Sequence, residues 1–354
     1  MAFKRLDPED FIVSSDSVTS TVWSNNSPSL NTYHSSSTQK EGTSGPYYLS
    51  VYQADASTSE AAVQFQIAYA NKNGGGGVNF DSSVPFVSPT TTIYGQYRTL
   101  VLEDENSDFV WGTDNTGSVD NDFYVISIER ARYKQSLLPG SLNLVLSSSN
   151  ALDANTAIQL TDDSNMVSLP TYYGTMRAYQ LISGSDGSSW DGGTGYTALS
   201  GSYGLVLPDI STILLNSAAL SGSGAGSGGI NIGTDITADN FGDNPTKLYN
   251  ALTGSAQFTP AVNVFELNSQ ETLTSDYVFI RARNSEYNYT ENPSFISGST
   301  GEVVFPYFIN NPQTYPTTVG LYNDSNDLLA VAKLSKPLNK DFTKEALIRV
   351  KLDF

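Results

Sequence analysis

Cysteine is absent from this 354-residue chain, and histidine occurs once, as His34. Without cysteine the chain can form neither disulfides nor thiolate metal sites, and one histidine excludes a multi-histidine metal centre. A Ser-His-Asp triad would depend on His34, which lies in a polar stretch without the strand-to-helix turn that presents such a nucleophile. The sequence therefore predicts no cofactor and no resident metal.

Charged side chains are also scarce, at 15% of the residues, and most of them are acidic. Thirty-six acidic and eighteen basic residues give a formal net charge of −18, which repels nucleic-acid phosphates and anionic lipids. No apolar run is long enough to span a membrane. The opening MAFKRLDPEDFIV has acids and a proline where a signal peptide needs an apolar run. We therefore expect a protein kept in water, with no nucleic-acid partner and no membrane insertion.

Short strand patterns recur along the chain. From Val63 to Tyr69, apolar residues alternate with glutamine and alanine, as in a strand with one face on a core. Runs rich in aromatic and β-branched residues predict further strands at Tyr47–Tyr52, Tyr97–Leu102, Phe123–Ile128, Leu142–Leu146 and Tyr277–Arg283. One short helix is predicted for DNPTKLYNAL, where Asp243 or Asn244 can cap and Pro245 suits the first helical position. The expected fold is mainly β, with several small antiparallel, sandwich-like domains, long Gly/Ser loops and few short helices.

Breaks rich in glycine and serine divide this pattern into regions. The expected regions are an extended N-terminal arm at 1–45, a β domain at 46–150, a glycine-rich β domain at 151–270 and a C-terminal β docking domain at 271–354. The arm is too polar for a compact core, so it either lies on a neighbouring subunit or is a disordered tail. Its apolar residues include Phe11, Ile12, Val22 and Trp23. Trp190, in the loop GSSWDGG, is either an anchor inserted into a partner or a lid on its own domain.

The C-terminal region ends in three strand patterns. Thr317–Tyr322 and Leu328–Ser335 flank a turn of Asn, Asp and Ser, which predicts a hairpin carrying Leu321 and Tyr322. Ala346–Phe354 then alternates strictly between apolar and polar residues, with Phe354 on the apolar face. We expect this run to be the third strand of a meander that holds the end of the chain in a sheet.

Basic residues gather at the same end. Residues 333–354 carry a net charge of +3, and residues 1–332 carry −21. A basic end on an acidic body is self-complementary in a repeated assembly. The alternative is a solvated sheet face whose lysines discourage edge-to-edge aggregation. The candidate interface residues are Phe11, Ile12, Val22, Trp23, Trp190, Leu321, Tyr322, Lys333, Lys336, Lys340, Arg349, Lys351 and Phe354.

Carboxylates are the catalytic groups that this composition leaves. Acids in Glu103–Asp108 and Asp114–Asp122 could form a glycosidase pair or a calcium site. Neither segment has the spacing of a calcium loop, and clusters of Asp and Asn in β proteins are usually turns. The sequence favours turns here, and also at Asp162 and Asp163.

Several stretches resemble virion structural proteins of tailed phages, most closely those of T-even-like cyanophages with contractile tails. The similar stretches include FKRLDPEDFIVSSDSVTSTVWS, YGQYRTLVLEDEN, ERARYKQSLLPGSLNLVL, GSYGLVLPDISTILLN and the segment from Arg281 to the end. VGLYNDSNDLLAVAKL also resembles the segment that helps fasten contractile-tail fibre proteins to a baseplate. The resemblance implies a tail or baseplate component assembled without a cofactor, and it assigns no catalytic residues.

The favoured function is therefore that of a non-enzymatic structural component of a phage virion, at the tail baseplate or the tail-fibre connection. Its expected partners are other virion proteins, namely baseplate, tail or fibre subunits, and further copies of itself in a symmetric assembly. Its expected location is the virion tail, after assembly in the host cytoplasm.

One alternative is a neck, collar or capsid-associated structural protein. Another is a tail-bound polysaccharide depolymerase that uses the acids between Glu103 and Asp122. The chain lacks the repetitive shaft of a fibre protein.

Overall fold

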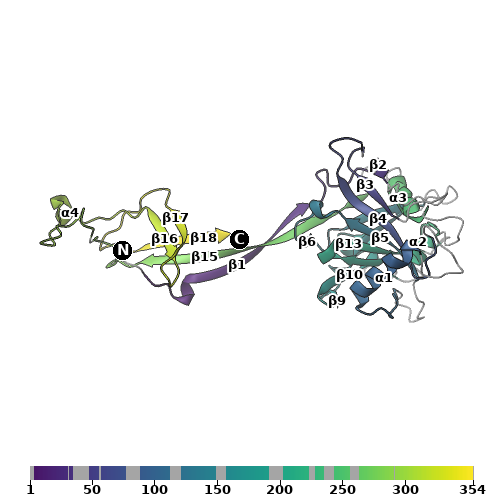
Figure 1. The fold of residues 1–354 in the computed structure, drawn as a ribbon, viewed down its shortest axis with the longest axis horizontal. Helices are drawn as coiled ribbons and strands as arrows, with labels where there is room; N and C mark the ends of the chain where they lie inside the picture. The colour runs from purple at the N-terminus through teal and green to yellow at the C-terminus, as the bar shows by residue number, and fades with distance from the viewer. Residues whose placement is uncertain are drawn as a thin grey trace. The chain divides into compact units, whose positions relative to one another are not determined.

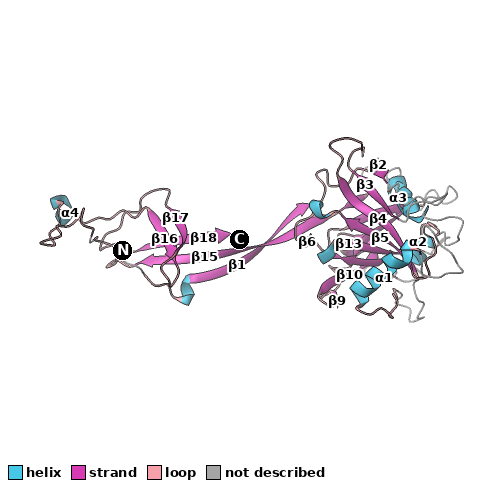
Figure 2. Cartoon of the chain, viewed as in Figure 1, coloured by secondary structure: helices cyan, strands magenta, loops and turns pink. Residues whose placement is uncertain are grey.

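The structure is a computed structural model. It describes residues 4–30, 32–34, 48–55, 57–76, 88–111, 121–148, 157–190, 202–222, 228–234, 243–255, 263–290 and 292–353. Strands hold 41% of the residues and helices 16%, and the sheets are antiparallel, so the prediction of a mainly β fold with few short helices is confirmed (Figure 2). In these residues no helix combines the length and the apolar character needed to cross a membrane.

The chain divides into two compact units. Unit 1 combines Met1–Ser17 with Thr272–Phe354, and unit 2 is Val18–Glu271. The charge is divided unequally between them. Unit 1 has ten basic and thirteen acidic residues, a net charge of −3, whereas unit 2 has eight basic and 23 acidic residues, a net charge of −15.

Unit 2 is built on one large antiparallel sheet that curls into a half-barrel. Its described strands lie in the order β14 (Phe265–Glu266), β7 (Asn143–Ser147), β8 (Ala157–Asp162), β10 (Met176–Ser185), β12 (Gly204–Leu207), β13 (Thr212–Asn216), β5 (Asp122–Ile128), β4 (Val63–Asn71), β3 (Tyr48–Tyr52) and β2 (Thr32–His34). Two further strands, β9 (Thr171–Tyr173) and β11 (Ser188–Ser189), pair with β10. One sheet thus takes strands from both the 46–150 and the 151–270 segments of the sequence.

The central strands of this sheet are apolar on both faces. In β5, Phe123 and Val125 join one buried cluster, while Tyr124 and Ile126 join another, because successive strand residues point to opposite faces. Helix α1 (Pro89–Leu102) packs on β4, and helix α3 (Asp243–Ser255) packs on β3, β4 and β7 (Figure 1). Each face of the sheet therefore has its own core.

Helix α3 confirms the helix predicted for DNPTKLYNAL, with its apolar residues Leu248, Ala251 and Leu252 buried. The strand predicted at Tyr97–Leu102 is wrong, because that segment is the last part of helix α1. Aromatic and β-branched residues made the short run resemble a strand. Over the longer segment, Tyr94 and Val101 recur with the spacing of a helix face and are both buried.

The remaining helices are short. In the residues that the structure describes they are α2 (Ser217–Ser221), α4 (Pro306–Asn310) and the 3-10 turns η1 (Pro8–Asp10), η3 (Arg130–Arg132) and η5 (Pro208–Ile210). Much of the predicted glycine and serine loops, including residues 191–195 and 223–227, lies outside the described residues.

A second sheet has the strand order β1 (Phe11–Thr21), β15 (Asn268–Ala282) and β18 (Ala346–Asp353), and β6 (Ser136–Leu137) also pairs with β15. Residues 11–21 of the predicted arm are therefore a strand beside β15 of the same chain, and not a disordered tail. Strand β18 confirms the predicted alternation, with Ala346 and Val350 buried and the residues between them alternating in exposure.

The predicted hairpin is confirmed as β16 (Thr318–Tyr322) and β17 (Leu328–Lys333). The predicted meander is wrong, since β18 pairs with β15 and the two hairpin strands form a sheet of their own. The register explains why β18 pairs with β15. Val350 lies opposite Val278 and Ile348 opposite Ile280, so apolar side chains meet across the pair.

Candidate functional site

Unit 1 has little apolar interior of its own. Among the described residues, both large hydrophobic clusters consist only of unit 2 side chains. Among the described residues of unit 1, the buried apolar side chains are Val278, Ala282, Ala346 and Val350, all on one face of the β15–β18 pair. Most of the large apolar side chains that the described chain exposes belong instead to unit 1.

The hairpin β16–β17 carries four of these exposed side chains. Val319 and Leu321 lie opposite Ala332 and Ala330, and all four are partly buried, so they form the inner face. The hairpin outer face is defined here as Gly320, Tyr322, Leu328, Leu329 and Val331. Leu328, Leu329 and Val331 are 51%, 68% and 58% exposed.

Gly320 fits the hairpin outer face because it has no side chain. A Cβ atom at this position would come within 2.8 Å of the Tyr322 ring and 3.3 Å of Leu328 Cδ1. Both side chains therefore lie across the bare backbone of Gly320, close to the sheet. The result is a low apolar surface in place of a row of protruding side chains.

The tip of the hairpin is fixed by one side chain. Asn323 Oδ1 accepts hydrogen bonds from the backbone N–H groups of Ser325 (3.0 Å) and Asp327 (2.8 Å). Its Nδ2 donates to Asp327 Oδ2 at 3.1 Å. Asn326 has a φ of 65°, a left-handed conformation that asparagine tolerates well. The turn predicted from NDSND therefore follows from the hydrogen bonding of asparagine side chains.

The two ends of the hairpin carry opposite charges. Asp324 and Asp327 are exposed at the tip, and Lys333 and Lys336 are exposed at the opposite end. The apolar residues of the hairpin outer face lie between them along the strands. The surface is thus an apolar strip with an acidic end and a basic end.

Strand β18 presents the other basic candidates. Arg349 is exposed, and its guanidinium carbon lies 5.4 Å from the centre of the Tyr277 ring. Lys351 Nζ pairs with Asp353 Oδ1 at 2.8 Å, and this hydrogen bond raises the pKa of Lys351 and lowers that of Asp353. Both groups are solvent-exposed, so the pair stabilises the strand only slightly.

Three of the predicted interface residues are buried within the chain. Val22 and Trp23 belong to the core of unit 2, where the Trp23 ring lies 4.7 Å from that of Phe265. Lys340 is fully buried, and its Nζ donates to Asn288 Oδ1 at 2.8 Å. These three side chains do not lie on the surface of the chain, because each is used to build the fold.

The other candidates have exposed or partly exposed side chains. Phe11 and Ile12 are half exposed, Leu321 lies on the partly buried inner face of the hairpin, and Tyr322 lies on its outer face. Trp190 of unit 2 is 63% exposed, and its Nε1 donates to Ser185 Oγ at 3.3 Å. Phe354 lies outside the described residues. Sequence reasoning missed Leu328, Leu329 and Val331, although the alternation of Leu329 and Val331 with the small Ala330 and Ala332 could have identified two of them.

Two carboxylates of the acidic segment from Glu103 to Asp108 take part in local structure. Asp104 accepts hydrogen bonds from the Asn106 backbone and the Ser107 hydroxyl, which lower its pKa. Asp108 pairs with Lys72 at 2.7 Å. These carboxylates form a turn and an ion pair, in agreement with the sequence interpretation.

The second acidic segment is described only in part. Asp114 and Asp120 lie outside the described residues. Asp122 Oδ2 accepts hydrogen bonds from the Tyr69 hydroxyl at 2.7 Å and the Ser217 hydroxyl at 2.6 Å. Within the described ranges, no group of three or more acidic or histidine side chains could hold a metal ion.

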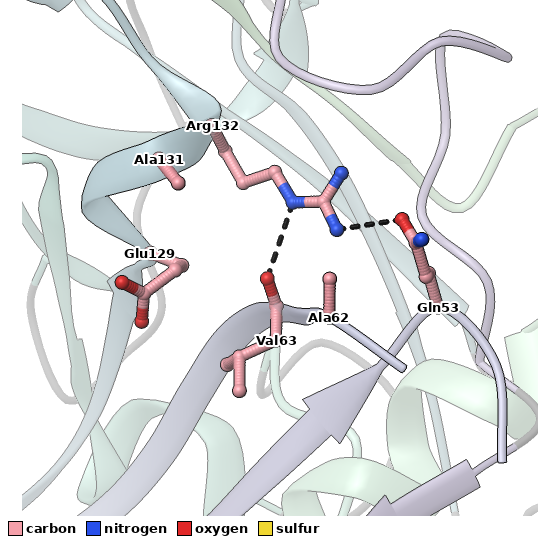
Figure 3. A pocket seen from close by; sticks show the side chains of 6 residues that line it. All are labelled: Gln53, Ala62, Val63, Glu129, Ala131 and Arg132. Carbon is pink, nitrogen blue, oxygen red and sulfur yellow. Dashed lines mark hydrogen bonds between the residues drawn. The ribbon is translucent and has the colours of Figure 1, made fainter. Parts of the chain in front are cut away.

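A pocket in unit 2 is lined by Gln53, Ala62, Val63, Glu129, Ala131 and Arg132 (Figure 3). Arg132 Nε donates to the Val63 carbonyl at 3.1 Å, and its Nη2 donates to Gln53 Oε1 at 2.6 Å. The guanidinium therefore links η3 to the ends of β3 and β4. Glu129 is the single carboxylate among the lining residues, so this pocket does not provide the pair of acids that glycoside hydrolysis requires.

No family model matches the chain, and neither a curated protein nor a solved structure is significantly similar to it.

Proposed function

We propose that this chain is a non-enzymatic structural component of a bacteriophage virion, at the tail baseplate or the tail-fibre connection. It acts by binding other subunits, and unit 1 is the part that docks. The sequence resemblance to tail proteins of contractile-tailed cyanophages supports the location. The exposed apolar surface of unit 1 supports the mechanism.

The observation that carries the proposal is the contrast between the two units. Unit 2 buries its apolar side chains in two clusters, whereas unit 1 leaves Leu329, Val331, Tyr307 and Ile309 largely exposed. Large exposed apolar surfaces on soluble proteins mark binding sites, because keeping them in water is unfavourable. A subunit that is always assembled keeps this surface covered by its neighbours.

Purified phage particles provide the test. Mass spectrometry of washed particles is expected to detect the chain in several copies, and gold-labelled antibodies are expected to mark the tail end. Labelling at the neck or the head would favour the collar or capsid alternative. Absence of the chain from washed particles would contradict a structural role.

A separate assay tests the enzymatic alternative. Purified chain incubated with host surface polysaccharide is expected to release no reducing ends. Release that is lost in the Glu103→Gln and Asp104→Asn double variant would favour a depolymerase, whose acids would then act directly on the sugar.

A further inference from the structure

The hairpin outer face has the charge arrangement of a surface that binds its own copy. Asp324 and Asp327 lie at one end of the apolar strip, and Lys333 and Lys336 lie at the other. If two such strips pack with their strands in the same direction, like charges meet at both ends. If a twofold axis perpendicular to the strands relates the two copies, their strands run in opposite directions. The acidic tip of each copy then meets the lysines of the other.

We propose that the hairpin outer face binds the same face of a second copy of this chain across a twofold axis. The inference deepens the proposed function by naming one partner of unit 1. It rests on the part of that function which makes unit 1 the docking unit. The apolar side chains of Tyr322, Leu328, Leu329 and Val331 would pack against their counterparts. The acidic tip would lie over the lysine end on both sides.

The dimensions of the hairpin fit this arrangement. Asp327 and Lys333 are six residues apart on an extended chain, a separation of roughly 20 Å at about 3.3 Å per residue. Both hairpin strands cover the same length, so a twofold axis through the middle of the strip brings each tip to the opposite end. Gly320 leaves the middle of the face low, which lets two sheets approach closely.

The charges also disfavour another occupant, the body of a neighbouring copy. Unit 2 has a net charge of −15, so it would attract the lysine end but repel Asp324 and Asp327. Unit 1 has a net charge of −3 and is the part of the chain where two copies approach with the least repulsion. A second hairpin places opposite charges at both ends of the strip.

The isolated contact is small, so its affinity should be low. Two strands of this length present a face of roughly 20 Å by 10 Å, well below the area of about 800 Å² per partner in ordinary stable interfaces. We expect a dissociation constant on the order of 100 μM, because so small an interface gains little beyond the entropy of association. In an assembly that already holds two copies close together, the same contact becomes intramolecular and much stronger.

The test is a charge-reversal cycle on the full chain, followed by sedimentation equilibrium at high protein concentration and low salt. The first variant combines Asp324→Lys with Asp327→Lys, and the second combines Lys333→Glu with Lys336→Glu. Each variant alone should self-associate at least ten-fold more weakly than the wild type, because like charges then meet at both ends. An equimolar mixture of the two should associate at least as well as the wild type, which also shows that both variants are folded.

Two leucine-to-serine variants, one on the hairpin outer face and one on unit 2, provide the test and its matched control. Leu329→Ser on the hairpin outer face should weaken self-association at least ten-fold, whereas Leu169→Ser, at a 77% exposed leucine of unit 2, should leave it unchanged. The proposal is overturned if the wild type stays monomeric at millimolar concentration or if either reversed variant self-associates like the wild type. It is also overturned if the mixture does not restore association. A monomeric chain that is still found in particles would refute only this inference, and a dimer absent from particles would refute only the proposed function.

Discussion

Two neighbouring acids of unit 2 have different surroundings. Asp162 accepts hydrogen bonds from the backbone N–H groups of Gly140 and Ser164 at 2.9 and 3.1 Å. Asp163 accepts one from the Gln180 N–H at 3.0 Å, but burial raises its pKa to about 6, with a smaller contribution from the nearby Asp162 charge. Desolvation thus outweighs the hydrogen bonds that lower the pKa of Asp163.

This raised pKa predicts how stability changes with pH. The folded chain binds the Asp163 proton more tightly than the unfolded chain, whose carboxyl has its ordinary pKa of 3.8. The contribution to stability is therefore fully present below about pH 4 and is lost as the pH rises through about 6. Asp163→Asn keeps an acceptor for the Gln180 N–H and removes the charge, so it should stabilise the protein by on the order of 1 kcal/mol at pH 7.5.

Urea denaturation at two pH values measures the effect. The gain from Asp163→Asn should shrink to near zero at pH 4, where the wild-type carboxyl also carries its proton. An equal gain at both pH values would show that burial does not control this group.

Among the elements, the hairpin depends on its turn more than on its inner face. Its inner side chains are small or only partly buried, whereas Asn323 makes three hydrogen bonds across the tip. Two-stranded sheets are marginal in water, so the turn has a large share in keeping the strands paired.

Asn323→Ala should therefore loosen β16 and β17 locally. The loss of two N–H acceptors costs about 1 to 2 kcal/mol, which corresponds to roughly ten-fold faster amide exchange in the hairpin. Asn326→Gly is the control, because glycine also accepts a φ of 65° and should leave exchange nearly unchanged. Hydrogen exchange with mass spectrometry measures both variants. Unchanged exchange in Asn323→Ala would mean that contacts of the inner face hold the hairpin.

For the molecule as a whole, the apolar interior is concentrated in unit 2. Its sheet has a core on both faces, with helices α1 and α3 packed against it. Unit 1 buries only a few apolar side chains among its described residues. Its local free energy of unfolding should therefore be lower than that of unit 2, since burial of apolar surface is the main stabilising contribution.

Limited proteolysis of the full chain in increasing urea tests this difference. The first cuts should fall in Thr272–Phe354, and a fragment containing most of unit 2 should persist to higher urea. Cleavage of both units at the same urea concentration would contradict the lower stability of unit 1. Under the proposed function, adding purified tail subunits should protect unit 1, because binding would cover its exposed apolar surface.

The sequence by itself determined the features that depend on neighbouring residues. Strict alternation predicted β18, the Asn and Asp turn predicted the hairpin, and proline at the first turn predicted α3. Local patterns are sufficient there because the side-chain period and the turn geometry act within a few residues. The short run at Tyr97–Leu102 was misread for the same reason, since six residues do not separate a strand from the end of a helix.

Only the tertiary structure decided which segments meet and which side chains are left exposed. The pairing of β18 with β15 joins residues 64 to 78 positions apart. Trp23 packs on Phe265, 242 positions away, and Lys340 bonds to Asn288, 52 positions away. The sequence alone does not show whether a basic or aromatic side chain is exposed to water or buried in a core. The strip on the hairpin exists because the inner face is partly buried while Leu328, Leu329 and Val331 of the outer face are exposed in the part of the chain that the structure describes, and that is a property of the folded molecule.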